Sequence, residues 1–193
     1  MAHGSKIKWK FASSLVMLVF LAGCGGMEGD TGAPSATVEN PPEGGIKKAY
    51  AIISPTKNSN VHGRVIFTEA EEGIRIVADV TGLIPGPHGF HIHEHGDCSS
   101  LDGSATGGHF NPRNAKHGGP DSEERHVGDL GNLIADEKGH AHYDRVDNLI
   151  TLNGEESIVG RSIVVHSEKD DFVSQPAGNS GRRLACGIIQ IGK

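Results

Sequence analysis

The sequence is poor in aromatic side chains, in cysteine and in positive charge. Only 5% of its 193 residues are aromatic, three are cysteine, and 18 lysines and arginines stand against 24 aspartates and glutamates, a formal net charge of −6. Nucleic-acid-binding surfaces are basic, and single strands are commonly held on aromatic side chains. The composition therefore predicts no nucleic-acid partner.

The chain also lacks a hydrophobic run of the roughly 20 residues that are needed to span a bilayer. The shorter apolar run at residues 11–21 follows three lysines and precedes small residues, which is the order of a secretory signal peptide. Its ending, Leu-Ala-Gly-Cys, resembles a bacterial lipobox, and this resemblance implies cleavage before Cys24 and lipidation of that cysteine. A soluble secreted protein that is cut near Ala22 is the alternative.

Residues 25–46 contain few large apolar side chains and many glycines, prolines and small polar residues, which is typical of a flexible linker. We therefore predict three parts: a lipoprotein signal peptide at residues 1–23, the lipidated cysteine with its linker at residues 24–46, and one folded domain at residues 47–193. The lipid would anchor the exported domain to a bacterial membrane, facing the periplasm or the cell surface.

No segment of the domain shows a sustained helical period, whereas short apolar alternations recur between turn signals. Apolar side chains occupy alternate positions at residues 61–67 and 74–80, which predicts two half-buried strands. Further strand-like runs are found at residues 130–135, 141–146, 158–166 and 184–191. For about 147 residues (193 − 46) with one core, an all-β sandwich or barrel is the natural solution.

Histidine is concentrated in residues 88–129, which hold seven of the twelve histidines. His91 and His93 lie two apart in a strand-like stretch, so both rings leave from the same face of the strand and can share a metal ion. Frequent glycine and proline then predict a long loop at residues 109–129. Loops of this length are usually functional or disordered.

Four side chains of this loop are candidate metal ligands: His109, His117, His126 and Asp129. Three imidazoles and one carboxylate suit tetrahedral zinc, and imidazole-rich sites also suit copper. A single histidine or aspartate is more often a surface or turn residue. The interpretation as ligands therefore depends on the spacing of the whole set.

Several segments of the chain, taken in order, resemble copper/zinc superoxide dismutase. They read GFHIHEHGD, GGHFNPRNAKHGGPDSEERHVGDLGN, GRSIVVH and GNSGRRLACGII, and the resemblance extends over roughly residues 47–193. It implies an all-β fold, an eight-stranded Greek-key β-barrel or sandwich with a long metal-binding loop and a second loop over the site. It also implies copper and zinc ions as cofactors and superoxide as the substrate.

The resemblance assigns a role to each matching residue. Copper would be held by His91, His93, His109 and His166. Zinc would be held by His109, His117, His126 and Asp129. The shared His109 would bridge the two ions as an imidazolate. Asp170 would accept hydrogen bonds from His91 and His117 and fix their orientation, although its charged neighbours alone predict a solvated acidic turn.

The implied reaction converts superoxide to dioxygen and hydrogen peroxide by alternate reduction and reoxidation of copper, which would protect exported or surface components. His109 would deliver a proton, and zinc would be structural and electrostatic because it has no accessible redox change. Arg183 would attract the anionic substrate, and the adjacent Arg182 leaves open which of the two points inward. The rival function is a copper- and zinc-binding lipoprotein that buffers or delivers metal without catalysis.

Cys98 and Cys186 form an even pair in an oxidising setting once Cys24 is lipidated, and the bridge of the family implies a disulfide between them. It would close a loop of 88 residues (186 − 98) and stabilise the fold by roughly 4 kcal/mol. The position of Cys98 directly after Gly-Asp resembles the bacterial branch of the family. His95 stands where eukaryotic relatives have a phenylalanine in a dimer contact, so a homodimer and a monomer both stay open.

Overall fold

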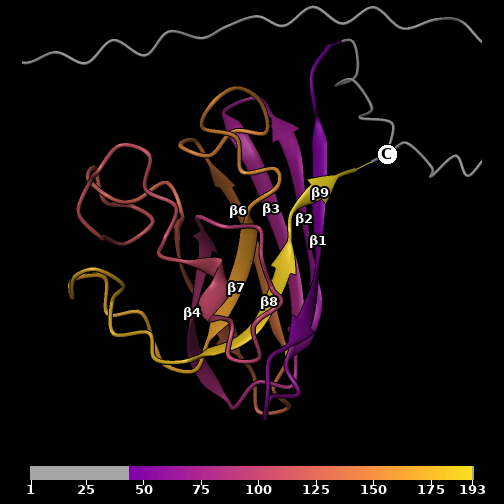
Figure 1. The fold of residues 1–193 in the computed structure, drawn as a ribbon, viewed down its shortest axis with the longest axis vertical. Helices are drawn as coiled ribbons and strands as arrows, with labels where there is room; N and C mark the ends of the chain where they lie inside the picture. Colours follow the sequence, from indigo (N-terminus) through magenta and orange to yellow (C-terminus); the bar gives the residue numbers. More distant parts are fainter. Residues whose placement is uncertain (1–43, 193) are drawn as a thin grey trace, which may run out of the picture. The chain divides into compact units, whose positions relative to one another are not determined.

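The computed structural model describes residues 44–192. The predicted signal peptide, Cys24 and the linker as far as residue 43 lie outside the described residues. Within the described residues, no helix is long and apolar enough to cross a membrane. The elements (Figure 1) are β1 (Lys48–Pro55), β2 (His62–Ala70), β3 (Gly73–Thr81), β4 (Gly86–His93), the 3-10 helix η1 (Ser104–Thr106), β5 (Asp129–Ala135), β6 (Ala141–Asp147), β7 (Ser162–His166), β8 (Arg183–Ile188) and β9 (Gln190–Ile191).

Eight of the strands close into an antiparallel barrel in the order β1-β2-β3-β6-β5-β4-β7-β8. Closure depends on β1, which pairs with β2 on one side and with β8 on the other, where Ser54 lies opposite Cys186. Most neighbouring strands are also consecutive in sequence, but β3 lies beside β6 and β4 beside β7, and these crossovers are those of a Greek key. The predicted eight-stranded all-β barrel is confirmed, and β9 adds a short pairing with β1.

Alternating side chains place the hydrophobic core inside the barrel. In β3, Ile74, Ile76 and Val80 are buried, whereas Arg75 and Asp79 are exposed. The same alternation continues in β2, so both predicted strands are present with the predicted faces inward. Burial of an aliphatic or aromatic side chain of this size is worth about 1.5–3 kcal/mol, which explains why the register of these strands is strongly specified.

Strand β4 differs from the others because it is buried on both faces. Phe90 and Ile92 belong to the hydrophobic core, and neither is exposed to solvent. His91 and His93 alternate with them and therefore point to the opposite face, where they are also at most 1% exposed. This strand thus carries core residues on one face and two buried, polar histidines, both candidate metal ligands, on the other.

Two of the predicted strand-like runs are broken in the structure. Residues 158–161 form a turn rather than the start of β7, with the Arg161 amide donating to the Ile158 carbonyl at 3.1 Å and Gly160 at a positive φ of 83°. Such a φ favours glycine and interrupts a strand. The run at residues 184–191 is likewise divided between β8 and β9.

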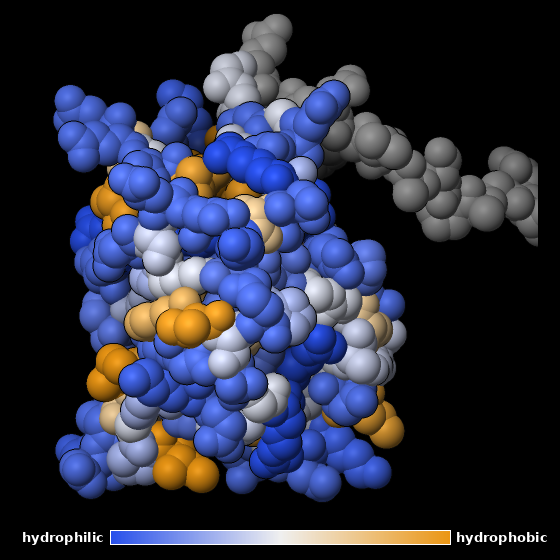
Figure 2. All heavy atoms as spheres, turned by 90° about the vertical axis from the view of Figure 1, so that its left-hand side faces the viewer, coloured by the Kyte–Doolittle hydropathy of each residue, from blue (hydrophilic) through white to orange (hydrophobic). Residues whose placement is uncertain are grey.

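Two long connections cover the outer face of β4. The first, residues 94–128, joins β4 to β5 and contains only the short helix η1, and the second, residues 167–182, joins β7 to β8. Both project from the same side of the barrel (Figure 1). On that side hydrophilic residues predominate, and apolar residues form small separate patches (Figure 2). The predicted long loop and second loop are therefore both present.

Candidate metal centre

A cluster of four buried imidazoles lies under the two loops. β4 contributes two of them and β7 ends in the third. The fourth lies within the connection between β4 and β5 and forms an isolated β-bridge with His93. The ligand atoms of the set all lie within 4.8 Å of one another; the members are His91, His93, His109 and His166. His93 Nε2 and His166 Nε2 are only 3.2 Å apart. We refer to this set as the four-histidine cluster.

A second cluster is centred on the Asp129 carboxylate at the start of β5. Its Oδ1 atom lies 2.7 Å from His109 Nδ1, 3.0 Å from His117 Nδ1 and 3.1 Å from His126 Nδ1. Three ring nitrogens that converge on one carboxylate oxygen form a set of donors suited to a shared cation. His109 belongs to both clusters, and its Nδ1 serves this second, three-histidine and aspartate cluster.

Three buried nitrogen atoms in the two clusters have no hydrogen-bond partner among residues 44–192. They are His91 Nδ1, His109 Nε2 and His117 Nδ1, of which the last lies 3.0 Å from Asp129 Oδ1 but without the geometry of a hydrogen bond. A buried polar atom without a partner costs about 1–3 kcal/mol, so their gathering in one place indicates a ligand. The donors are imidazole nitrogen and carboxylate oxygen, which suit copper and zinc. The residues present therefore fit both metal ions.

Asp170 connects the two clusters from outside. Its Oδ2 atom lies 2.8 Å from His91 Nε2, and its Oδ1 atom lies 2.9 Å from His117 Nε2. Because each of these nitrogens donates to the carboxylate, each Nδ1 is left with its lone pair directed into a cluster. The solvated acidic turn that composition predicted is wrong for Asp170, which is fully buried.

Backbone carbonyls fix two further rings of the four-histidine cluster, those of His93 and His166, in the same manner. His93 Nδ1 donates to the Gly107 oxygen at 2.9 Å, and His166 Nδ1 lies 3.3 Å from the Gly181 oxygen. Each Nε2 then faces the four-histidine cluster as an acceptor. Both loops therefore contribute to the orientation of the histidines on the strands.

Two amide side chains hold this framework and were not identified from the sequence. Asn132 pairs with the Asp170 backbone, accepting its N–H at 2.8 Å and donating to its oxygen at 3.0 Å. Gln175 pairs likewise with the His117 backbone, at 2.8 and 2.9 Å. These contacts join residues 38 and 58 positions apart, and no local pattern marks either residue.

An open cleft of about 710 Å³ leads to the centre, and Arg183 lies on its wall beside His93, His109 and His166. Arg183 is half-buried; its Nη1 and Nη2 atoms donate to the carbonyl oxygens of Gly103 at 2.8 Å and Gly107 at 2.6 Å. Arg182 also lines the cleft but is exposed. Of the two arginines, Arg183 is therefore the one that is held against the loop beside the histidines.

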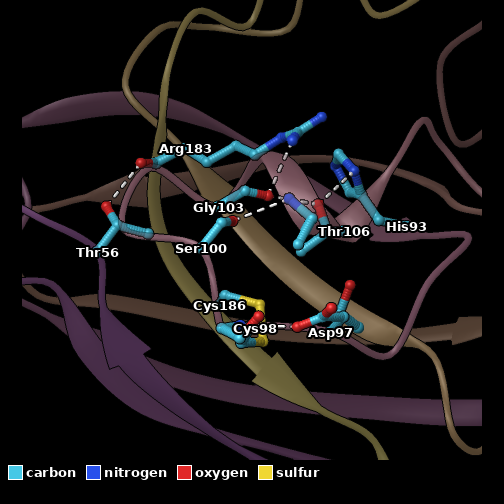
Figure 3. Close-up of a disulfide and its surroundings, with 12 residues drawn as sticks. Thr56, His93, Asp97, Cys98, Ser100, Gly103, Thr106, Arg183 and Cys186 are labelled. Atoms are coloured by element: carbon cyan, nitrogen blue, oxygen red, sulfur yellow. Dashed lines mark hydrogen bonds between the residues drawn. A yellow bond between two sulfur atoms is a disulfide. The ribbon is translucent and has the colours of Figure 1, made fainter.

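The predicted disulfide between Cys98 and Cys186 is present, with the two Cα atoms 5.8 Å apart. It joins the long loop to β8, the strand that begins with Arg183. In the close-up, the disulfide lies below the loop that carries Gly103 (Figure 3). The covalent link therefore ties the backbone that holds the Arg183 guanidinium to the strand from which that side chain leaves.

Burial lowers the pKa of His91, His93 and His166, and it lowers the pKa of His109 to about 4. For His117, burial also acts to lower the pKa, but the Asp129 and Asp170 carboxylates outweigh it and raise the pKa to about 9. The four-histidine cluster is therefore neutral at pH 7. Neutral imidazole is the form that binds a metal ion.

Acid is expected to destabilise the metal-free protein between about pH 6.5 and pH 4. Because the pKa values of the four-histidine cluster are lowered in the folded state, the unfolded chain binds more protons than the folded chain below pH 6.5. The free energy of unfolding therefore decreases as the pH is lowered. His117 acts oppositely, because its contribution is complete below pH 6.5 and is lost as pH rises towards 9. Urea midpoints across this range measure the effect, and a midpoint that rose on acidification would contradict it.

Comparisons with known proteins agree with this arrangement. A family model described as copper/zinc superoxide dismutase matches residues 61–189. Over 155 residues the chain is 44% identical to an extracellular Cu-Zn superoxide dismutase of Brugia pahangi, covering 75% of this chain and 77% of that protein. It is also similar to the crystal structure of the clock protein EA4, with a TM-score of 0.70, 40% identity, and coverage of 76% of this chain and 96% of that one.

Proposed function

The chain belongs to the copper/zinc superoxide dismutase family, and from this premise we propose how its own residues serve the conversion of superoxide to dioxygen and hydrogen peroxide. The four-histidine cluster would hold copper, and the Asp129 cluster would hold zinc. The observation that carries this assignment is the position of His109, which belongs to both clusters: its Nδ1 lies 2.7 Å from Asp129 Oδ1, and its buried Nε2 has no hydrogen-bond partner among the described residues. When bound, copper supplies one-electron redox chemistry and zinc supplies fixed positive charge.

The residues around the centre orient the ligands and move the proton. Asp170 and the Gly107 and Gly181 carbonyls hold the outer nitrogens, which fixes each ring and its tautomer. His109 Nε2 has no other partner among the described residues and its ring lines the cleft, so it can take up a proton and pass it to the peroxide product. Asp129 keeps His109 Nδ1 directed to the zinc side.

Arg183 would attract and orient the anionic substrate. After removal of the predicted leader, which carries three lysines and no acidic residue, 15 basic residues (18 − 3) face 24 acidic ones, a net charge of −9. Such a protein repels an anion at long range, whereas a half-buried guanidinium at the cleft attracts it locally. A local positive charge next to the histidines is therefore needed for fast capture.

Replacement of Arg183 by alanine is expected to lower the rate of superoxide removal at low salt and to make the rate less sensitive to added salt. The reason is that the attraction between the Arg183 charge and the anion acts through solvent and is screened beyond about 10 Å at 0.1 M salt. Arg182→Ala is the matched control, because its side chain lies at the same cleft but is exposed. Stopped-flow rates of superoxide removal are compared for the two variants across a salt series. An equal loss of rate in Arg183→Ala and Arg182→Ala would reject the specific role of Arg183.

We further propose that the exported protein is anchored through a lipid on Cys24. The Cys98–Cys186 disulfide agrees with an oxidising compartment, and the lipobox-like ending of the leader supports cleavage before Cys24. Cells that express the full chain are expected to retain it in the membrane fraction and to release Cys24→Ala in soluble form. Mass spectrometry of the mature N-terminus checks the modification, and an unmodified N-terminus near Ala22 would instead indicate a soluble secreted protein.

A further inference from the structure

A ring of hydrogen bonds joins the Arg183 guanidinium to His93 through Gly103, Thr106 and Gly107. Figure 3 shows the half of the ring that passes through Gly103 and Thr106. Arg183 donates to the Gly103 oxygen at 2.8 Å and to the Gly107 oxygen at 2.6 Å. His93 Nδ1 lies 2.9 Å from the same Gly107 oxygen and 3.2 Å from Thr106 Oγ1. Thr106 Oγ1 is 3.0 Å from the Gly103 oxygen, which closes the ring.

The direction of each bond follows from which atoms can donate. Because His93 Nε2 faces the four-histidine cluster as an acceptor, its Nδ1 carries the proton and donates to both Gly107 and Thr106. The Thr106 hydroxyl accepts this bond and gives its own hydrogen to Gly103. Every donor of the ring then has an acceptor, and both carbonyl oxygens are shared between Arg183 and the His93 side.

The hydroxyl of Thr106 is not required for the local turn. The Thr106 amide already donates to the Gly103 oxygen at 3.1 Å, which forms the backbone turn of η1. Thr106 is nevertheless fully buried, with 0% of its surface exposed. A buried hydroxyl is costly unless it is hydrogen-bonded. Here one of its bonds leads to His93 and the other to the Gly103 oxygen, which also accepts from Arg183. Packing alone would be served equally well by valine.

We propose that Thr106 is a positioning residue whose hydroxyl couples the orientation of the Arg183 guanidinium to that of the His93 imidazole. The inference deepens the proposed function, since it rests on the roles proposed for those two side chains. As a second acceptor for His93 Nδ1–H, the hydroxyl fixes the ring plane and favours electron density at Nε2. Through the Gly103 oxygen it also supports the guanidinium at the cleft.

Thr106→Val and Thr106→Ser separate the hydroxyl from the shape of the side chain. Valine keeps the shape and removes the hydroxyl, whereas serine keeps the hydroxyl and removes the methyl group. Each copper- and zinc-loaded protein is titrated with azide, a small monovalent anion, and exchange of the His93 Nδ1 proton is followed by NMR in the diamagnetic Cu(I) form. We expect Thr106→Val to weaken azide binding about 10-fold and to speed the exchange, and Thr106→Ser to behave like the parent protein.

Thr56→Val is the control for the loss of a nearby hydroxyl. Thr56 Oγ1 donates to the carbonyl oxygens of Arg183 and Leu184 at 2.8 and 2.9 Å but takes no part in the ring, so exchange of the His93 proton should not change. Parent-like behaviour of Thr106→Val, or equal impairment of Thr106→Ser, would overturn the inference. Unchanged azide binding in Arg183→Ala would instead overturn the proposed role of Arg183, whatever Thr106 does.

Discussion

Replacement of His166 by alanine is expected to abolish superoxide removal and copper retention while zinc stays bound. His166 is the last residue of β7, is only 4% exposed and belongs to the four-histidine cluster alone. Its loss leaves three imidazoles in the four-histidine cluster but removes no member of the Asp129 cluster. The fold should survive, because the removed ring lies at the cleft and not in the hydrophobic core.

The experiment compares metal content and activity in the mature protein, His166→Ala and the control His142→Ala. His142 is exposed on the barrel, lies in contact with Asp79 and belongs to neither cluster. We expect the parent and the control to contain about one copper and one zinc ion per chain and to have full activity. A parent protein that holds both metals but removes no superoxide would contradict the dismutase assignment of this chain and leave a metal-buffering lipoprotein.

Replacement of Arg125 by methionine is expected to lower the free energy of unfolding by about 3–5 kcal/mol. The Arg125 guanidinium donates to Asp147 at 2.6 Å, and both side chains are at most 2% exposed. It also donates to the backbone carbonyl oxygens of two members of the Asp129 cluster, His126 at 3.1 Å and Asp129 at 3.2 Å. Removal of the arginine leaves a buried carboxylate and these oxygens without their partner.

Arg75→Met is the matched control, because Arg75 pairs with Asp144 at the same distance of 2.6 Å but with side chains 56% and 38% exposed. An exposed pair is worth about 0–1 kcal/mol. Urea unfolding of both metal-free variants measures the difference, and the pair Arg125→Met with Asp147→Leu should recover part of the loss since no buried charge is left alone. Equal destabilisation by the two single changes would show that burial does not decide the effect.

The strands were predictable wherever one face is buried and the other is wet. In β3, Ile74 and Arg75 begin an alternation that only one register satisfies. The turn at residues 158–161 was missed because Ile158 and Val159 are apolar and continue the run into β7. Ile158 is indeed buried, but it reaches the core from a turn, where burial does not require a strand.

The candidate ligands could be proposed from the sequence because several histidines stand close together in it. Asn132, Gln175 and Thr106 could not, since each is an ordinary polar residue whose role depends on a contact made only after folding. Asp170 shows both sides of this limit: its neighbours predict exposure, and only resemblance to a family suggested that it lies between two histidines. Composition reports the average environment of a segment and not that of its one buried member.

Because both faces of β4 are buried, this strand tolerates no change in its number of residues. Insertion or deletion of one residue before Phe90 would exchange the faces of the strand, because side chains alternate with a period of two. His91 and His93 would then enter the apolar interior, and Phe90 and Ile92 would line the polar centre. Changes in length should therefore be confined to the connections between strands, and β4 should behave as a fixed frame for both interior and centre.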